Sequence, residues 1–115
     1  MEIIPQCFSL LLVGSLMVIA AYAGSDGAVP RNASFGIRTR WSMSSDAAWV
    51  ETHRVFRPYS WICLGESVVF VIALIAVYVA SGSVSTASVL MMCGFGMILL
   101  TTFAGLRAAK KAVTK

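Results

Sequence analysis

Three long apolar stretches dominate the pattern of hydrophobic and polar positions. They run over about residues 5–23, 59–80 and 86–106, and each is long enough for a helix that crosses the hydrocarbon core of a bilayer. The first and third carry no charged side chain, and the second carries only Glu66. None alternates like a barrel strand, and a spanning segment has to satisfy its own backbone hydrogen bonds. The pattern predicts an all-α membrane protein with three transmembrane helices.

Composition supports this interpretation and excludes other classes of protein. The chain is 58% hydrophobic and 12% charged, with a mean hydropathy of +0.83. Soluble domains carry roughly twice that share of charge. A length of 115 residues also excludes a multidomain enzyme, so we expect one membrane domain over residues 1–115. The sequence has no Gly-rich phosphate loop and no clustered Cys or His residues, which predicts no enzymatic activity, no metal site and no cofactor.

The basic residues predict the orientation. All of them lie in the loop 24–58 or in the tail 107–115: Arg31, Arg38, Arg40, Arg54, Arg57, Arg107, Lys110, Lys111 and Lys115. Three spans place the loop and the tail on one side, and the positive-inside rule identifies that side as cytoplasmic. We therefore expect a multi-pass plasma-membrane protein with its N-terminus outside. An alternative is a signal peptide cleaved after Ala23, although the chain begins Met1-Glu2 without a positive segment.

The loop carries a helical pattern of its own. Ser44 or Ser45 is a suitable N-cap, and Asp46 follows in the first turn, where a carboxylate opposes the helix dipole. Three large side chains then share one face: Trp49, His53 and Phe56. We expect a short amphipathic helix, lying in the headgroup region and ending before Pro58, which begins the second span. Side chains expected to anchor the loop at the membrane surface are Arg40, Trp41, Arg54 and Arg57.

Charged side chains near or inside the membrane are the candidate binding residues. Arg38 and Arg40 are suited to lipid phosphate, to an acidic partner or to Glu66, and headgroup anchoring is the simplest role. Glu66 lies about 10 Å inside the second span, where a carboxylate is costly. Pairing with Arg38 or Arg57, a ligand or proton role, and simple snorkelling all remain open for Glu66.

Several spaced residues resemble the signature of the SdpI family of bacterial integral membrane proteins. These are Gly36-Ile37-Arg38-Thr39, Ser44-Ser45-Asp46, Trp49 and His53-Arg54, within a match over roughly residues 32–75. One departure is Val55-Phe56-Arg57-Pro58, where the family usually has a glycine. The resemblance implies that Arg38, Thr39, Trp49 and His53 are the residues of interest. It also implies immunity to a secreted peptide toxin, and a receptor that holds a transcriptional repressor at the membrane.

The favoured function is therefore binding by an SdpI-like membrane protein, in toxin immunity or membrane-linked signalling. Expected partners are the bilayer, a peptide toxin or a cytoplasmic regulator, and a second copy or a larger membrane complex, without direct contact to nucleic acid. One alternative is an accessory subunit, because Gly94, Gly96 and Gly105 permit close helix contact. A proton-coupled transporter that uses Glu66 is less well supported. The small multidrug exporters have four spans and carry the carboxylate in the first.

Overall fold

The computed structural model describes residues 3–31 and 36–114 and places three helices in them. Helix α1 covers Ile3–Ser25, α2 covers Asp46–Ser81 and α3 covers Val84–Val113. Each is long and apolar enough to cross a membrane. The three long apolar helices expected from the hydrophobic pattern are therefore confirmed, and every helix extends beyond the apolar stretch that predicted it.

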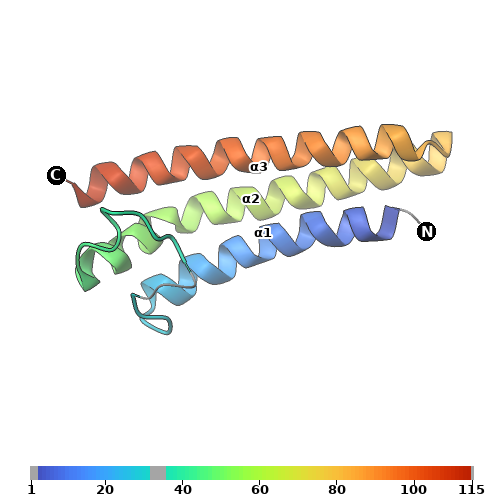
Figure 1. Ribbon diagram of the computed structural model, residues 1–115. Coiled ribbons are helices and arrows are strands. Elements are labelled where there is room, and N and C mark those ends of the chain that lie inside the picture. The colour runs from blue at the N-terminus through green and yellow to red at the C-terminus, as the bar shows by residue number, and fades with distance from the viewer. Residues whose placement is uncertain (1–2, 32–35, 115) are drawn as a thin grey trace.

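The helices lie side by side in an elongated bundle, with α2 between α1 and α3 (Figure 1). The molecule measures 51 × 24 × 19 Å. Helix α2 packs along both neighbours, whereas α1 and α3 touch each other much less. The N-terminus and the short link of Gly82 and Ser83 lie at one end, and the C-terminus and the α1–α2 loop lie at the other (Figure 1).

Small residues let the helices approach one another closely. A Cβ atom on Gly14 of α1 would lie 2.4 Å from Oγ of Ser67 on α2. A Cβ on Gly94 of α3 would lie 3.0 Å from the Phe70 ring on α2. Such contacts are typical of helix packing inside a membrane, where lipid tails are as apolar as the side chains. The surface turned away from the bundle carries large exposed residues such as Ile72 and Leu99.

Helix α2 begins well before the apolar span. The side chain of Ser45 accepts a hydrogen bond from the Ala48 N–H at 3.0 Å, as expected of an N-cap, and the helix then runs on through Pro58 to Ser81. The expectation of a separate interfacial helix is wrong, because residues 46–56 form the first turns of the spanning helix itself. We take 59–80 as its membrane-spanning part.

Tertiary packing explains this difference. Trp49, His53 and Phe56 do share one face, but they are at most 2% exposed, so this face is covered by protein rather than by headgroups. Proline removes one i→i−4 hydrogen bond and crowds the preceding turn. Packing on both sides of Pro58 holds the helix together across that gap, since most helical stability in a protein comes from buried faces.

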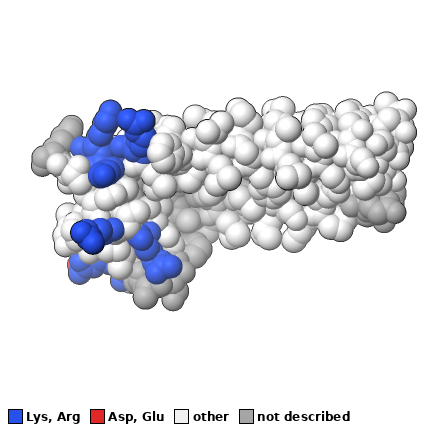
Figure 2. Space-filling model, turned by 45° about the horizontal axis from the view of Figure 1, so that its top comes forward, with Lys and Arg blue, Asp and Glu red and all other residues white. Residues whose placement is uncertain are grey.

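Positive charge is concentrated at one end of the bundle. Figure 2 shows Lys and Arg gathered there, while the remainder of the visible face carries none. We call this the basic end, and its described members are Arg31, Arg38, Arg40, Arg54, Arg57, Arg107, Lys110 and Lys111. Both basic segments of the sequence therefore lie at the same end of the molecule. The side of the membrane on which this end lies remains a prediction.

Candidate functional site

The α1–α2 loop folds into a compact structure at the basic end. We call it the loop lobe: residues 26–31, residues 36–45 and the α2 turns over 46–57. Its tightest part is a turn around Thr39 and Ser42. The buried Ser42 hydroxyl donates to the Ile37 carbonyl at 2.8 Å and accepts from the Thr39 N–H at 2.8 Å. Thr39, a predicted binding residue, therefore has its polar groups engaged in shaping the loop.

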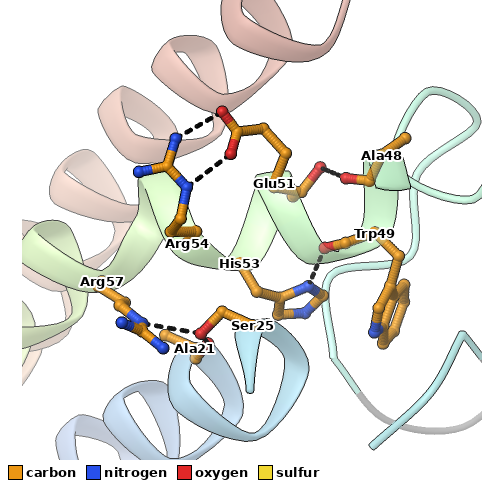
Figure 3. A network of polar contacts seen from close by, with 9 residues as sticks. Ala21, Ser25, Ala48, Trp49, Glu51, His53, Arg54 and Arg57 are labelled. Atoms are coloured by element: carbon orange, nitrogen blue, oxygen red, sulfur yellow. Dashed lines mark hydrogen bonds and ion pairs between the residues drawn. The ribbon is translucent and has the colours of Figure 1, made fainter. Parts of the chain in front are cut away.

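His53 connects this turn to α2. Its side chain is fully buried, and Nδ1 lies 2.8 Å from the Trp49 carbonyl (Figure 3). Nε2 lies 3.0 Å from the Ile37 backbone nitrogen. A carbonyl only accepts and an amide N–H only donates, so Nδ1 carries the proton and Nε2 accepts. These partners require a neutral imidazole. His53 is thus a structural link between the loop and the helix.

Two glycines form the walls around the His53 ring. A Cβ on Gly24, near the end of α1, would lie 2.3 Å from Cγ of His53. A Cβ on Gly36 would lie 2.8 Å from Nε2, and Gly36 also has a φ of +102°, which side chains disfavour. Gly36 lies in the motif of the family resemblance, but Gly24 gave no sequence signal beyond the end of a helix.

Trp49 fills the centre of the lobe. Its ring is 1% exposed and lies 4.4 Å from the His53 ring, centroid to centroid. The indole Nε1 donates to the Val29 carbonyl at 3.0 Å, which ties the first part of the loop to α2. Trp49 was expected to rest at the membrane surface, and the structure buries it inside the protein instead.

Acid is expected to loosen the loop lobe. Burial lowers the pKa of His53 below its ordinary value of 6.5, although the hydrogen bond to Trp49 opposes this. The unfolded chain therefore binds a proton at a higher pH than the folded chain. The stability contributed by neutral His53 is complete above pH 6.5 and is lost as pH falls through the folded-state pKa, by at most about 1.4 kcal/mol per pH unit.

The thermal unfolding midpoint in detergent, followed from about pH 8 to about pH 5, measures this loss, because histidine is the side chain that titrates there. His53 is the single histidine of the sequence, so a His53→Asn variant provides the control. We expect its midpoint to be lower and to change little with pH. A wild-type midpoint that stays constant below pH 6.5 would contradict the prediction.

Arg57 joins the lobe to α1. Its Nε donates to the Ser25 hydroxyl at 2.7 Å (Figure 3). Its terminal nitrogen pairs with Asp26, and its guanidinium lies 4.4 Å from the centre of the Tyr22 ring. The Trp61 indole in turn donates to the Tyr22 hydroxyl at 2.8 Å. Arg57 is therefore engaged at the junction of α1 and α2, and it does not pair with Glu66.

The other loop arginines differ in their partners. Arg54 forms a bidentate ion pair with Glu51 on the exposed side of α2, and both N–O distances are 2.6 Å (Figure 3). Arg38 and Arg40 are also exposed, and neither has a hydrogen bond or an ion pair with any residue in 3–31 or 36–114. Trp41 is partly exposed beside them. Arg38 and Arg40 are therefore free to contact something outside the bundle.

Glu66 lies away from the lobe, between α2 and α3. It is partly buried, and the Thr101 hydroxyl lies 2.9 Å from both of its carboxyl oxygens. The partner of this carboxyl group is thus a hydroxyl on α3 rather than a loop arginine. Across the described ranges, no group of His, Cys, Asp and Glu is arranged to hold a metal ion.

Comparison with known proteins identifies the family of this chain. The model of the SdpI/YfhL protein family matches residues 28–106, more than half of the chain. The match extends the resemblance seen over residues 32–75, and it includes the loop, α2 and most of α3. No curated protein and no solved structure matches the chain. A match of this extent shows that the chain belongs to the SdpI/YfhL protein family.

Proposed function

We propose that this protein acts by binding, in immunity to a membrane-active peptide toxin or in signalling to a cytoplasmic regulator. In this proposal the basic end faces the cytoplasm, as the positive-inside rule requires, and the lipid bilayer holds the three spans. The family match over residues 28–106 is the observation that carries the proposal, because it includes the whole second half of the loop lobe.

The candidate residues divide into two groups that fit such a role. Thr39, Trp49 and His53 have partners inside the loop lobe and fix its shape. Arg38 is exposed and has no partner among the described residues, so its guanidinium is available to a carboxylate or a phosphate. A rigid lobe that presents a free arginine suits recognition, since little conformational entropy is lost when a partner binds.

A proton-coupled transporter has less support. That role needs an intramembrane carboxyl group that exchanges its proton or ligand during transport. Here Glu66 is held by Thr101 between two packed helices. No described basic residue forms an ion pair with Glu66.

Expression of the full chain in a bacterium that lacks it tests the proposal. We expect higher survival under secreted membrane-active peptides, or a changed transcript profile, relative to an empty vector. Arg38→Gln should reduce the effect about tenfold, the loss of one charge-assisted contact, at an equal level of protein in the membrane. Arg54→Gln removes the same charge from an arginine already paired within the chain, and it should retain the effect.

Unchanged survival together with an unchanged transcript profile for the wild-type chain would overturn the proposal. Equal losses in Arg38→Gln and Arg54→Gln would mean that net charge matters rather than the position of Arg38.

A further inference from the structure

We propose that the basic end binds one anionic phospholipid, with an acyl chain in an apolar cavity beneath the loop lobe and the phosphate between Arg40 and Lys110. This inference does not rest on the proposed function. It is carried by two neighbouring cavities, one lined by apolar side chains and the other by two basic side chains among its lining residues.

The first cavity is apolar and lies between α1 and α3. Its volume is about 430 Å³, within the range typical of small-molecule sites. It exists because α1 and α3 touch little, which leaves a space that the loop covers from one end. Side chains from every part of the fold line it, among them Met17, Ala20, Ile37, Phe56 and Leu106. Leu16 also lines it and is 44% exposed, so the cavity opens on the surface that faces lipid tails.

The second cavity has a volume of about 440 Å³ and is formed by the same two segments, the α1–α2 loop and α3, at positions further along each. Arg40 follows Thr39 of the first cavity, and Lys110 follows Leu106 by one helical turn on the same face of α3, about 6 Å further along the axis. The remaining lining residues are Trp41, Ser44, Val113 and Thr114. An apolar cavity is therefore followed by one that carries two basic side chains, in the direction that leads out of the membrane.

Charge in the second cavity suits a phosphate. Arg40 and Lys110 are exposed and have no ion pair with a described residue, and no acidic side chain lines the cavity. The last carbonyls of α3 disfavour an anion, but the ammonium group of Lys110 in the final turn offsets them. The Ser44 and Thr114 hydroxyls already donate to the carbonyls of Trp41 and Lys110, so the two basic side chains are the groups that would hold the phosphate.

An amphiphile fits both cavities at once, which a free anion does not. A free phosphate would occupy only the cavity with the two basic side chains, and it has no apolar part that could fill the other cavity. A phospholipid beside the bundle already holds its tail at the depth of the first cavity and its phosphate at the level of the basic end. Anionic lipids are also the ones that basic side chains at a membrane surface attract.

The test uses the full chain, purified in a nonionic detergent and titrated separately with dilauroyl phosphatidylglycerol, dilauroyl phosphatidylcholine and inorganic phosphate. Native mass spectrometry reports the number of bound molecules and Kd, and the thermal unfolding midpoint reports stabilisation. We expect one phosphatidylglycerol per chain and a rise in midpoint. Phosphatidylcholine should bind at least about tenfold more weakly, and phosphate alone should have no effect.

Two pairs of matched variants locate the site. Arg40→Gln with Lys110→Gln should raise Kd for phosphatidylglycerol about thirtyfold, whereas Arg54→Gln with Lys111→Gln removes the same charge outside both cavities and should leave Kd unchanged. Ala20→Phe fills the apolar cavity and should abolish binding of phosphatidylglycerol. Ala104→Phe places the same ring on the exposed side of α3, outside the cavity, and should leave that binding unchanged. If Ala20→Phe does not fold, the charge variants still decide the matter.

Several results would overturn the inference. Equal binding of the two lipids would remove headgroup recognition, and an equal effect of inorganic phosphate would assign the cationic cavity to a free anion. Wild-type lipid binding by Ala20→Phe would exclude the apolar cavity. A protein dimer that Ala20→Phe abolishes would assign that cavity to a second copy of the chain.

Discussion

Replacement of Trp49 with alanine is expected to lower the free energy of unfolding by about 3–5 kcal/mol. The indole is 1% exposed and packs on His53, so its removal leaves a cavity at the centre of the loop lobe. The Val29 carbonyl also loses the donor that lies 3.0 Å away. Unfolding in mixed detergent measures the loss, and amide hydrogen exchange at Ile37 shows whether the loop detaches from α2.

Trp61→Ala is the matched control for this substitution. Trp61 is 52% exposed on the same helix and also donates one hydrogen bond, to Tyr22. We expect its replacement to cost about 1 kcal/mol, the usual net value of a hydrogen bond, with protection at Ile37 retained. Equal losses for the two variants would mean that the buried ring does not form the core of the lobe.

Gly36→Ala is expected to destabilise the lobe by about 2–5 kcal/mol, the sum of two costs. The backbone at Gly36 has a φ of +102°, and the added Cβ would lie 2.7 Å from Cη2 of Trp49 and 2.8 Å from Nε2 of His53. The same unfolding and exchange measurements report the loss.

Gly27→Ala separates the two costs. Gly27 has a φ of +82° but open space around it, so alanine there carries the backbone cost alone, about 1–2 kcal/mol. A smaller ring at position 49 should relieve the steric contact with the added Cβ, because the phenyl ring of Trp49→Phe lacks the end of the indole that crowds Gly36. Gly36→Ala should therefore cost less in a Trp49→Phe background. Equal costs for Gly36→Ala in both backgrounds would exclude the contact with Trp49.

The sequence predicted those parts of the fold that depend on local properties. The length of an apolar stretch decides whether it can cross a bilayer, and all three spans were predicted on that basis. The N-cap at Ser45 and the shared face of Trp49 and His53 were also readable, because each depends on residues within a few positions.

The predictions that failed concern features that depend on contacts between residues far apart in the sequence. The pattern showed an apolar face over residues 46–56 but not what covers it, and the covering of that face by protein is what carries the helix through Pro58. The wall that Gly24 forms against His53 joins positions 29 residues apart, so the glycine appeared only as a helix terminator. Glu66 was recognisable as a buried carboxyl group, but its partner Thr101 lies on another helix.

The continuity of α2 gives the bundle a mechanical property. Its 36 residues run along most of the 51 Å length of the molecule, well beyond the roughly 30 Å of the hydrocarbon core, so the loop lobe lies on an extension of the spanning helix itself (Figure 1). A helix whose apolar stretch is longer than the hydrocarbon core can accommodate the difference by tilting. Such a tilt of α2 would move the loop lobe relative to the headgroup plane without any rearrangement of the contacts inside the lobe.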